Sequence, residues 1–340
     1  MEKSLLEIEK LNVEYDTDDA IVYALNDFTL SVSPGQKIGL VGETGAGKTT
    51  LALSILRLLP QKVGRITSGA IRYEGENLLD KPESYMLGLR GRRISMIFQD
   101  PMTSLNPVKS VGDQVLEVLN LHFPNLSKAE KNQKVDEMFS LVGIPASRKG
   151  EFPHQFSGGM KQRIVIAMAL IAEPELLLAD EPTTALDVTI QAQILELMKD
   201  LKKKFNSAVI LITHDLGVVA EFCDSVAVVY AGRVVEIGSV EDIFDSHHNH
   251  PYTKGLIKCI PDLSSTAARL NPIPGHMADP RIKSLGCCFA NRCEYCTEKC
   301  RTQAPTMHFV DSDNDVSARE SISTDQHGIL CHLYAKEENR

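Results

Sequence analysis

Residues 42–49 form a glycine-rich octapeptide, G-E-T-G-A-G-K-T, whose residue types and spacing are suited to phosphate binding. In the pattern G-x-x-x-x-G-K-T, backbone N–H groups surround a nucleotide's phosphates, the lysine reaches the β- and γ-phosphates, and the threonine hydroxyl reaches Mg²⁺. The apolar run 38–41 predicts a strand before the octapeptide and residues 49–59 predict a helix after it, so a helix N-terminus faces the phosphates. The expected phosphate site consists of Gly42, Gly45, Gly47, Lys48, Thr49 and Thr50.

Two carboxylates, Asp180 and Glu181, end a second apolar run at residues 175–180. Open α/β sheets bind ligands at the carboxyl ends of their strands. Asp180 is suited to hold Mg²⁺, and Glu181 is suited to polarise an attacking water, because a general base must lie within about 3 Å of the proton it takes. On their own, the two acids could also simply begin a surface turn.

Gln99 and His214 each follow a predicted strand, at residues 94–98 and 208–213. His214 could donate a hydrogen bond to the γ-phosphate, and Gln99 could reach both Mg²⁺ and the attacking water. A histidine at a strand end is more often a helix cap or a surface residue, and a glutamine there can be an ordinary polar terminus.

A second anion site is predicted at Ser157, Gly158 and Gly159, which open an apolar helix that runs to residue 172. A serine hydroxyl, bare backbone amides and a helix dipole together favour a phosphate. This site lies far along the chain from the octapeptide, so we expect it to serve a different nucleotide.

The elements that position these residues indicate a layered α/β fold. Residues 5–15 and 21–32 alternate like strands and predict a small β layer ahead of the core. Residues 101–154 change to helical spacing, with helices at 111–121 and 127–142, the second opened by a capping box at Ser127 and Glu130. The runs 175–180 and 208–213, separated by the helical stretch 190–205, are typical of parallel strands buried on both faces.

The composition is that of an ordinary globular chain of 340 residues with a formal net charge of −9. This charge argues against broad binding to nucleic acid, because such domains usually carry a basic face. No signal peptide is visible in the charged N-terminal segment, and the longest apolar run, 164–172, is far shorter than the roughly 18 residues of a membrane span.

The cysteines cluster near the C-terminus: of 8 in the chain, five fall between Cys287 and Cys300, and Cys331 follows. In a reducing compartment such clusters bind metal more often than they form disulfides. Thiolates suit zinc or an iron–sulfur cluster, and the spacing does not decide between these and free or oxidised thiols. The short stretch 247–250, His-His-Asn-His, is expected to be a solvated loop.

In order along residues 1 to about 245, the motifs resemble those of the ATP-binding-cassette (ABC) ATPases. The matches are residues 42–49 to the Walker A loop, Gln99 to the Q-loop, residues 157–159 to the signature, residues 176–180 to the Walker B strand, Glu181 to the catalytic glutamate, residues 185–187 to the D-loop and His214 to the switch histidine. Phe156 and Met160 depart from the ends of the family's usual Leu-Ser-Gly-Gly-Gln, but the central Ser-Gly-Gly is intact.

The resemblance implies a P-loop NTPase (RecA-like) α/β core with an N-terminal antiparallel β subdomain, a helical subdomain at about 101–172 and a small Cys-rich C-terminal extension. The implied domains are residues 1–250, which bind nucleotide, and residues 251–340. Two subunits would stack head to tail, the signature and Asp187 of one closing over ATP held by the other. Tyr15 would stack on adenine, with Tyr23 as the rival.

The segment after residue 250 resembles the C-terminal extension of dipeptide and oligopeptide transporter ATPases, through Pro251-Tyr-Thr and Gly286-Cys-x-Phe-x-x-Arg-Cys. Members with four such cysteines hold a 4Fe-4S cluster. The resemblance gives the ligands as Cys287, Cys293, Cys300 and Cys331, and leaves Cys288 and Cys296 as extras.

The function implied is ATP hydrolysis that energises a membrane importer of di- and oligopeptides, at the cytoplasmic face of the cell membrane. The implied partners are a second, paralogous ATPase, two transmembrane permease subunits and, indirectly, an extracytoplasmic solute-binding protein, with no nucleic acid. Three alternatives stay open: an importer of nickel, glutathione or another small solute, a non-transport cassette ATPase of DNA repair or translation, and a structural role without hydrolysis.

Overall fold

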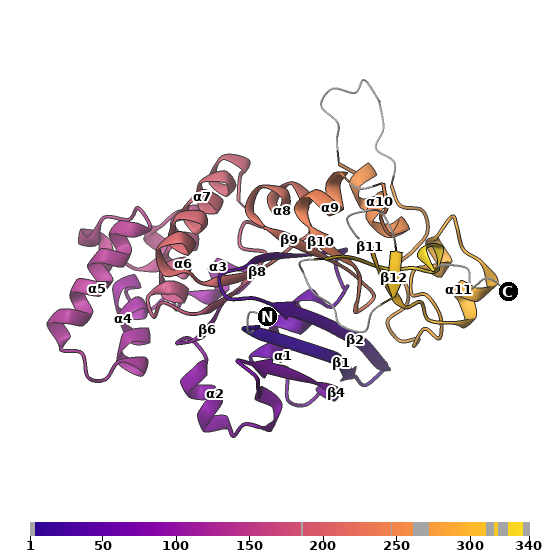
Figure 1. Cartoon of the computed structure of the whole chain (residues 1–340). Helices are drawn as coiled ribbons and strands as arrows, with labels where there is room; N and C mark the ends of the chain where they lie inside the picture. The colour runs from indigo at the N-terminus through magenta and orange to yellow at the C-terminus, as the bar shows by residue number, and fades with distance from the viewer. Residues whose placement is uncertain are drawn as a thin grey trace. The chain divides into compact units, whose positions relative to one another are not determined.

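A computed structural model describes residues 4–184, 186–245, 247–260, 272–310, 316–318 and 326–335 (Figure 1). The chain divides into two compact units. Unit 1 contains residues 1–33, 38–80 and 213–340, and unit 2 contains residues 34–37 and 81–212. The domain boundary expected between residues 250 and 251 stays a prediction, and unit 1 holds residues from both sides of it.

Unit 1 begins with the antiparallel β layer that the alternating sequence predicts. Its strands, in the order β2-β1-β4-β5, are β1 (Leu6–Asp16), β2 (Ile21–Val32), β4 (Gly64–Tyr73) and β5 (Glu76–Asn77). Leu6, Ile8 and Val13 of β1 are buried at 1% exposure or less. The register of β1 shifts between Ile8 and Val13 at bulges. Gly69 opposite has a φ of 96°, and a Cβ there would lie 2.6 Å from the carbonyl oxygen of Lys10, so both the backbone and the packing favour glycine.

A second group of strands in unit 1 carries the predicted phosphate loop. The strand β3 (Lys37–Val41) pairs in parallel with β9 (Ser225–Tyr230), which pairs antiparallel with β10 (Arg233–Ser239). The helices α8 (Leu216–Phe222) and α9 (Val240–Asp245) lie on one face of β9 and β10 (Figure 1). A Cβ on Gly39 would lie 2.6 Å from Val219 of α8, so the glycine lets this helix approach β3 closely.

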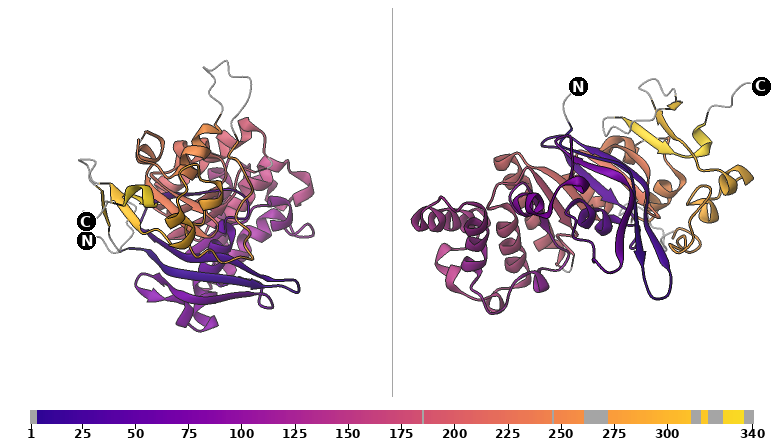
Figure 2. Two further views of the ribbon diagram at one scale, coloured as in Figure 1. Left: turned by 90° about the vertical axis from the view of Figure 1, so that its right-hand side faces the viewer. Right: turned by 90° about the horizontal axis from the view of Figure 1, so that it is seen from below.

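The small Cys-rich C-terminal extension continues these strands. The strand β13 (His327–Leu330) pairs with β10, and β11 (Met307–Val310) pairs with both β13 and β12 (Val316–Ala318). Ile237, Phe309 and Ile329 are completely buried where the strands meet. Figure 2 shows short helical turns and strands in the rest of the described extension. These include α10 (Pro251–Lys258), α11 (Glu298–Thr302) and the 3₁₀ turns η4 (Ala290–Arg292) and η5 (His332–Tyr334).

Unit 2 contains the predicted strand–helix–strand element. The strands β6 (Ile94–Ile97), β7 (Leu176–Asp180) and β8 (Ala208–Thr213) are parallel neighbours, and every residue of β7 and β8 is buried. The helix α7 (Val188–Phe205) connects β7 to β8. The other helices and 3₁₀ turns of this unit are α2 (Glu83–Leu89), α3 (Pro101–Ser104), α4 (Val111–His122), α5 (Lys128–Leu141), η2 (Ala146–Gly150), η3 (Pro153–Gln155) and α6 (Gly158–Leu170).

Backbone conformation and side-chain caps determine where the helices begin and end, and some ends differ from the predictions by a few residues. The helix α1 (Lys48–Ile55) stops before the predicted residue 59, because Arg57 adopts a left-handed φ of 52° ahead of Pro60. The helix α5 begins at the expected capping box, with Ser127 accepting from the Glu130 N–H and Glu130 accepting from the Ser127 N–H. The remaining short turn, η1 (Leu78–Asp80), follows β5.

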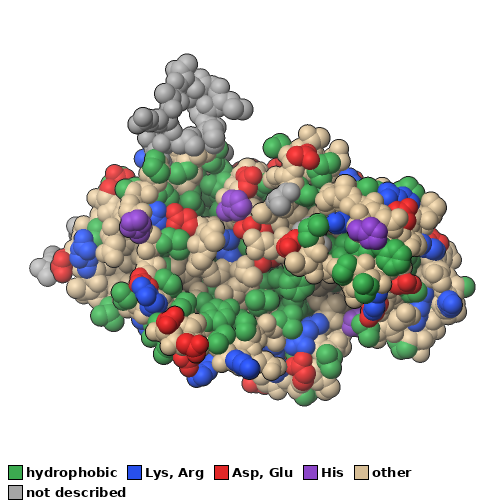
Figure 3. Space-filling model, turned by 180° about the vertical axis from the view of Figure 1, so that it is seen from behind, with side chains coloured by type: hydrophobic (Ala, Val, Ile, Leu, Met, Phe, Trp, Pro, Cys, Tyr) green, Lys and Arg blue, Asp and Glu red, His purple; other side chains and the backbone are tan. Residues whose placement is uncertain are grey.

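The described residues include no helix long and apolar enough to cross a membrane. On the face drawn in Figure 3, Lys and Arg side chains are interspersed with Asp and Glu. The described part of that face therefore carries no continuous basic region of the kind that tracks a nucleic-acid backbone.

Candidate nucleotide-binding site

The octapeptide folds as a compact loop between β3 and α1 in unit 1. The buried Lys48 ammonium donates to the carbonyl oxygens of Gly42 at 2.7 Å and Glu43 at 3.0 Å, so it lies folded back over the start of the loop. The N–H of Ala46 donates to the Glu43 carbonyl at 3.1 Å, which closes the turn. The loop thus places a cation and the N-terminus of α1 together, as anion binding requires.

Two positions of this loop are glycine for steric reasons. A Cβ on Gly42 would lie 2.1 Å from the carbonyl oxygen of Val229. Gly47, the N-cap of α1, has a φ of 99°, and a Cβ there would lie 2.5 Å from the carbonyl oxygen of Ala24. Both positions exclude a side chain, so the packing of unit 1 requires glycine where the sequence motif has it.

The other predicted residues of this loop lie at the exposed start of α1. Thr49 is exposed there, and Thr50 is paired with Tyr15, whose hydroxyl lies 3.2 Å from the Thr50 hydroxyl. Tyr23 is engaged differently: its N–H donates to the Pro280 carbonyl at 2.7 Å. Both tyrosines belong to unit 1, and the stacking role expected for Tyr15, with Tyr23 as its rival, stays a prediction.

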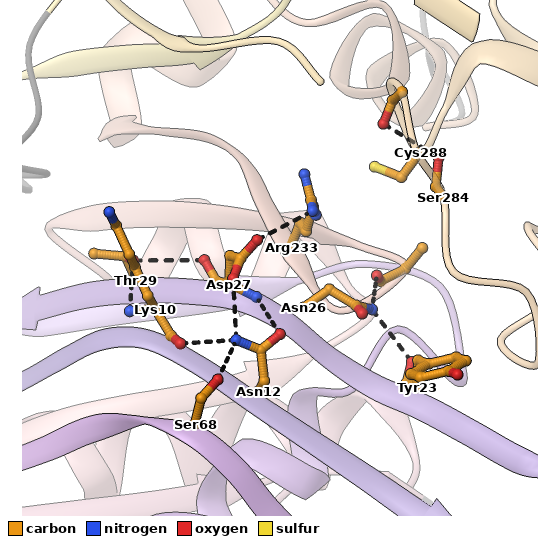
Figure 4. Close-up of polar contacts among 12 residues, drawn as sticks. Lys10, Asn12, Tyr23, Asn26, Asp27, Thr29, Ser68, Arg233, Ser284 and Cys288 are labelled. Atoms are coloured by element: carbon orange, nitrogen blue, oxygen red, sulfur yellow. Dashed lines mark hydrogen bonds and ion pairs between the residues drawn. The ribbon is translucent and has the colours of Figure 1, made fainter. Parts of the chain in front are cut away.

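A cavity of about 590 Å³ in unit 1 opens beside the loop residues Thr44 and Gly45. Figure 4 shows part of its wall: the Asn26 amide nitrogen donates to the carbonyls of Tyr23 at 3.3 Å and Ala231 at 3.1 Å. Ser284 and Cys288 of the extension contribute to the lining of the same cavity.

Beside the cavity, Arg233 forms an ion pair with Asp27 at 3.3 Å, and Asn12 donates to Asp27 at 3.0 Å and to Ser68 at 3.0 Å (Figure 4). This network joins β1, β2, β4 and β10. It ties the N-terminal β layer to the strands that carry the phosphate loop.

In unit 2 the structure brings two of the predicted catalytic residues together. The Gln99 side-chain nitrogen donates to a Glu181 carboxylate oxygen at 3.0 Å, and the Thr184 hydroxyl donates to the same oxygen at 2.9 Å. Glu181 has a left-handed φ of 45°, which is unusual for a residue with a side chain, and its N–H donates to the Ile212 carbonyl at 2.8 Å. Asp180 is 2% exposed at the end of β7. These hydrogen bonds fix the Glu181 carboxylate beside the Gln99 side-chain amide, which can also bind water.

The predicted signature residues open α6 as expected. Ser157 is the N-cap and accepts from the Met160 N–H, and Ser157 and Gly158 are exposed. A Cβ on Gly159 would lie 2.6 Å from the Ile190 side chain, so this glycine also lets α6 and α7 approach. Asp187 caps α7 by accepting from the Ile190 N–H at 3.0 Å. Of the predicted D-loop, Ala185 lies outside the described residues.

His214 belongs to unit 1 and is exposed, directly after β8 and before Asp215, the N-cap of α8. The phosphate loop, Tyr15 and His214 thus belong to one unit. Gln99, Asp180, Glu181, the signature residues and Asp187 belong to the other. The roles expected for these residues stay predictions.

The expected iron–sulfur site is wrong for this structure. Among the described residues, which include all six C-terminal cysteines, no group of three or more His, Cys, Asp or Glu side chains is arranged to hold a metal ion. The thiols have local partners instead. Cys288 lies 3.8 Å from the Tyr230 carbonyl oxygen, and Cys300 lies 3.3 Å from the Thr297 hydroxyl. Cys287, Cys293, Cys300 and Cys331 therefore do not form the predicted ligand set.

Hydrogen bonds and burial shift the pKa values of two of these thiols in opposite directions. A hydrogen bond with Cys288, followed by one with His250, lowers the pKa of the Cys287 thiol to about 4 against the opposing effect of burial. Burial raises the pKa of the Cys331 thiol to about 12. The neighbouring cysteines thus differ widely in protonation.

The stretch 247–250 is only in part the solvated loop that its polarity predicts: His247 is exposed, whereas Asn249 and His250 are buried. The Asn249 amide donates to the completely buried Glu236 carboxylate at 3.1 Å, and the His250 N–H donates to it at 2.9 Å. His327 lies 2.7 Å from the same carboxylate. The polar residues of this stretch therefore compensate a buried acid of β10.

Comparison with known proteins identifies the family. Residues 25–184 match the model of the ABC transporter family, and residues 235–300 match the C-terminal region of oligopeptide/dipeptide transporters. The chain is 48% identical to a probable peptide ABC transporter ATP-binding protein, y4tR, of Sinorhizobium fredii, over 89% of this chain and 91% of that protein. It is 46% identical to the dipeptide transport ATP-binding protein DppD of Bacillus subtilis, over 98% and 95%.

The chain belongs to the ATP-binding subunits of ABC transporters. Among solved structures, this ABC ATPase resembles the ATP-binding cassette MJ0796 in a dimeric post-hydrolysis state with ADP and Pi. The TM-score is 0.62 at 25% identity, over 69% of this chain and 98% of that one. It also resembles CbiO1 of Clostridium perfringens, with a TM-score of 0.63 at 29% identity over 72% and 92%. The predicted α/β cassette fold is thus confirmed, and the chain is an ABC-type ATPase.

The sequence did not reveal one group of residues beside the ATPase loop. Glu43, within the octapeptide, is contacted by Tyr252 and Arg292 of the extension. Glu43 occupies one of the variable positions of the motif, and Arg292 lies 249 residues away along the chain, so no local spacing connects them. The available signal was the charge of Glu43 among otherwise uncharged variable positions.

Proposed function

We propose that this chain is the ATP-hydrolysing subunit that energises a membrane importer of di- and oligopeptides. The observation that carries the proposal is the match of residues 235–300 to the C-terminal region of oligopeptide/dipeptide transporters, on the same chain as the phosphate loop. Relatives with names that specify peptide transport, and one named as a putative peptide import ATP-binding protein, align over about nine-tenths of the chain. These features favour a peptide importer over one for nickel and over a non-transport ATPase.

In the proposed reaction, Lys48 and the N-terminus of α1 hold the phosphates, and Glu181 takes a proton from the attacking water. Gln99 orients Glu181 through the hydrogen bond described above. Oxygen donors from Thr49, Gln99 and Asp180 match the hard ligands that Mg²⁺ prefers. When bound, Mg²⁺ would neutralise phosphate charge as the phosphoryl group transfers.

The proposed assembly contains a second ATPase subunit, a paralogue of this chain, and two transmembrane permease subunits at the cytoplasmic face of the cell membrane. Ser157, Gly158 and Gly159 offer an exposed helix N-terminus that suits the ATP held by the other ATPase subunit. The helical insert from about residue 101 to residue 155 would receive the cytoplasmic coupling helices of the permease subunits. An extracytoplasmic solute-binding protein would deliver the peptide without touching this chain.

Reconstitution in proteoliposomes tests the proposal. The native complex is captured through this chain, its partners are identified, and uptake of labelled oligopeptides and of Ni²⁺ is measured with ATP inside the vesicles. We expect two permease subunits, a paralogous ATPase and uptake of peptide. Uptake of Ni²⁺ alone would favour the importer of another solute, and capture of a ribosome or DNA-repair complex would contradict transport.

A further inference from the structure

The phosphate-binding loop is held by a partly buried ion pair with the C-terminal extension. The Arg292 guanidinium donates to both oxygens of the Glu43 carboxylate, at 2.7 and 3.0 Å. The side chain of Arg292 is only 5% exposed and that of Glu43 is 29% exposed. A two-pronged arginine–carboxylate pair of this kind fixes orientation as well as distance.

Arg292 is itself held firmly by neighbouring groups. Its guanidinium also donates to the carbonyl oxygens of Pro274 at 3.0 Å and Ile273 at 3.3 Å. The guanidinium carbon lies 5.8 Å from the ring centre of Tyr230 and 5.9 Å from that of Phe289. Because this side chain is fixed on several sides, it can act as a rigid support for Glu43.

Tyr252 provides a second support for the same loop residue. The Glu43 N–H donates to the Tyr252 hydroxyl at 2.9 Å. The Tyr252 side chain is completely buried, and its ring packs against Tyr230 at 4.7 Å and Phe289 at 5.4 Å between centres. Burial raises the pKa of the Tyr252 hydroxyl, which therefore stays neutral. Both the side chain and the backbone of Glu43 are thus fixed by the extension.

Glu43 in turn contacts the lysine that the motif assigns to the phosphates. The Lys48 ammonium donates to the carbonyl oxygens of Gly42 and Glu43, so these carbonyls fix the position of the ammonium group. A continuous path of contacts therefore runs from Arg292 and Tyr252, through Glu43, to Lys48.

We propose that Arg292 and Tyr252 are positioning residues for ATP: the C-terminal extension presets the phosphate-binding loop through Glu43. This inference rests on the proposed ATPase function and adds to it a role for the extension. It implies that loss of the ion pair lets the loop adopt conformations that bind ATP poorly. The apparent affinity is then reduced by the fraction of molecules in the competent conformation.

A double-mutant cycle on the full chain tests this. The variants are Arg292→Ala, Glu43→Gln, their double mutant and Arg292→Lys, which keeps the charge but loses the two-pronged geometry. The control is Arg281→Ala, which breaks the exposed ion pair with Asp279 in the same extension. Equilibrium binding of a fluorescent ATP analogue with Mg²⁺, the KM and kcat for ATP in the assembled transporter, and thermal unfolding are measured for each.

We expect each single variant of the pair to raise the Kd and KM for ATP about tenfold, as loss of a charged hydrogen bond would. The double mutant should bind no more weakly than either single variant, because the two residues act through one contact. Arg292→Lys should recover part of the affinity, kcat should stay near wild type, and Arg281→Ala should change neither constant.

Unchanged Kd in folded Arg292→Ala and Glu43→Gln would overturn the inference, as would additive effects in the double mutant. If Arg292→Ala does not fold, Glu43→Gln and Arg292→Lys still decide, because both keep the positions filled by polar side chains. A wild-type chain that fails to bind ATP would overturn the proposed function and the inference together. A wild-type chain that binds, with an unchanged Kd in the variants, overturns the inference alone.

Discussion

The phosphate-binding loop and the cysteine-rich segment 287–300 both belong to unit 1, but their order comes from different physical sources. The loop is set by its backbone: glycines fit where a Cβ would strike a neighbouring carbonyl, and the chain runs directly into α1. The cysteine-rich segment contains little regular structure, and Arg292 within it contacts Glu43 of the loop. The segment therefore supports the loop through Arg292, whereas the residues expected to act on ATP belong to the cassette.

The largest effect is expected when the proposed general base of the cassette is removed and the fold is kept. We expect Glu181→Gln to lower ATP turnover in the assembled transporter by about 10²–10⁴-fold, because the amide cannot take a proton from water. The Kd for ATP should stay close to wild type. Phosphate release and equilibrium ATP binding measure the two quantities.

The matched control is Glu173→Gln, which removes a carboxylate from a surface ion pair with Lys134 at 3.5 Å. Turnover should remain at the wild-type level in this control. Retained turnover in Glu181→Gln would show that the catalytic role belongs to another residue.

The packing of the extension against β10 should depend on the buried acid Glu236 of that strand. Glu236→Ala removes the carboxylate that His327, Asn249 and the His250 N–H contact. We expect a loss of about 3–5 kcal/mol in the free energy of unfolding, as when one partner of a buried pair is removed. Urea denaturation of the full chain measures it, with the exposed Glu241→Ala as control. A loss below about 0.5 kcal/mol, the usual surface range, would mean that the polar cluster does not hold the extension.

Substitutions at two glycines distinguish a glycine that the loop's packing requires from one that only lowers helix propensity. Gly42→Ala should lower the free energy of unfolding by about 1–3 kcal/mol and weaken ATP binding, because its Cβ meets the Val229 carbonyl at 2.1 Å. Gly88→Ala, in α2 with nothing within 4 Å of the added Cβ, should instead stabilise the chain by about 0.4–1 kcal/mol. Equal effects at both positions, measured by thermal unfolding, would contradict the steric account of the loop.

The smallest expected effect concerns a cap in unit 2. Ser127→Ala removes one half of the capping box of α5 and should cost about 1 kcal/mol of stability. Ser140→Ala, whose hydroxyl only donates to the Asp136 carbonyl one turn back in the helix, should change stability by less than about 0.5 kcal/mol. The stabilities of the two variants are compared through their denaturant midpoints. Equal shifts would show that the cap adds no stability beyond that of an ordinary exposed serine.

Features encoded by neighbouring residues could be predicted from the sequence. The octapeptide, the capping box at Ser127 and the strand–helix–strand around α7 each depend on residues close along the chain, and each formed as expected. Pairing of β13 with β10, burial of His250 and the Arg292–Glu43 ion pair join distant segments, so no local pattern reports them. The cysteine prediction was wrong because a metal site needs three or more ligands in a suitable geometry, which spacing along the chain does not ensure and which the described residues do not provide.

The most direct test of the central claim is an equilibrium titration of the full chain with a fluorescent ATP analogue and Mg²⁺, for wild type and Lys48→Ala. The account predicts saturable binding by wild type. It predicts a Kd about 10–100-fold higher in the variant, because a charged hydrogen bond to phosphate is lost. The exposed Lys62→Ala should match wild type. Equal affinity in wild type and Lys48→Ala, or no binding by wild type, would contradict the assignment of residues 42–49 as the nucleotide site.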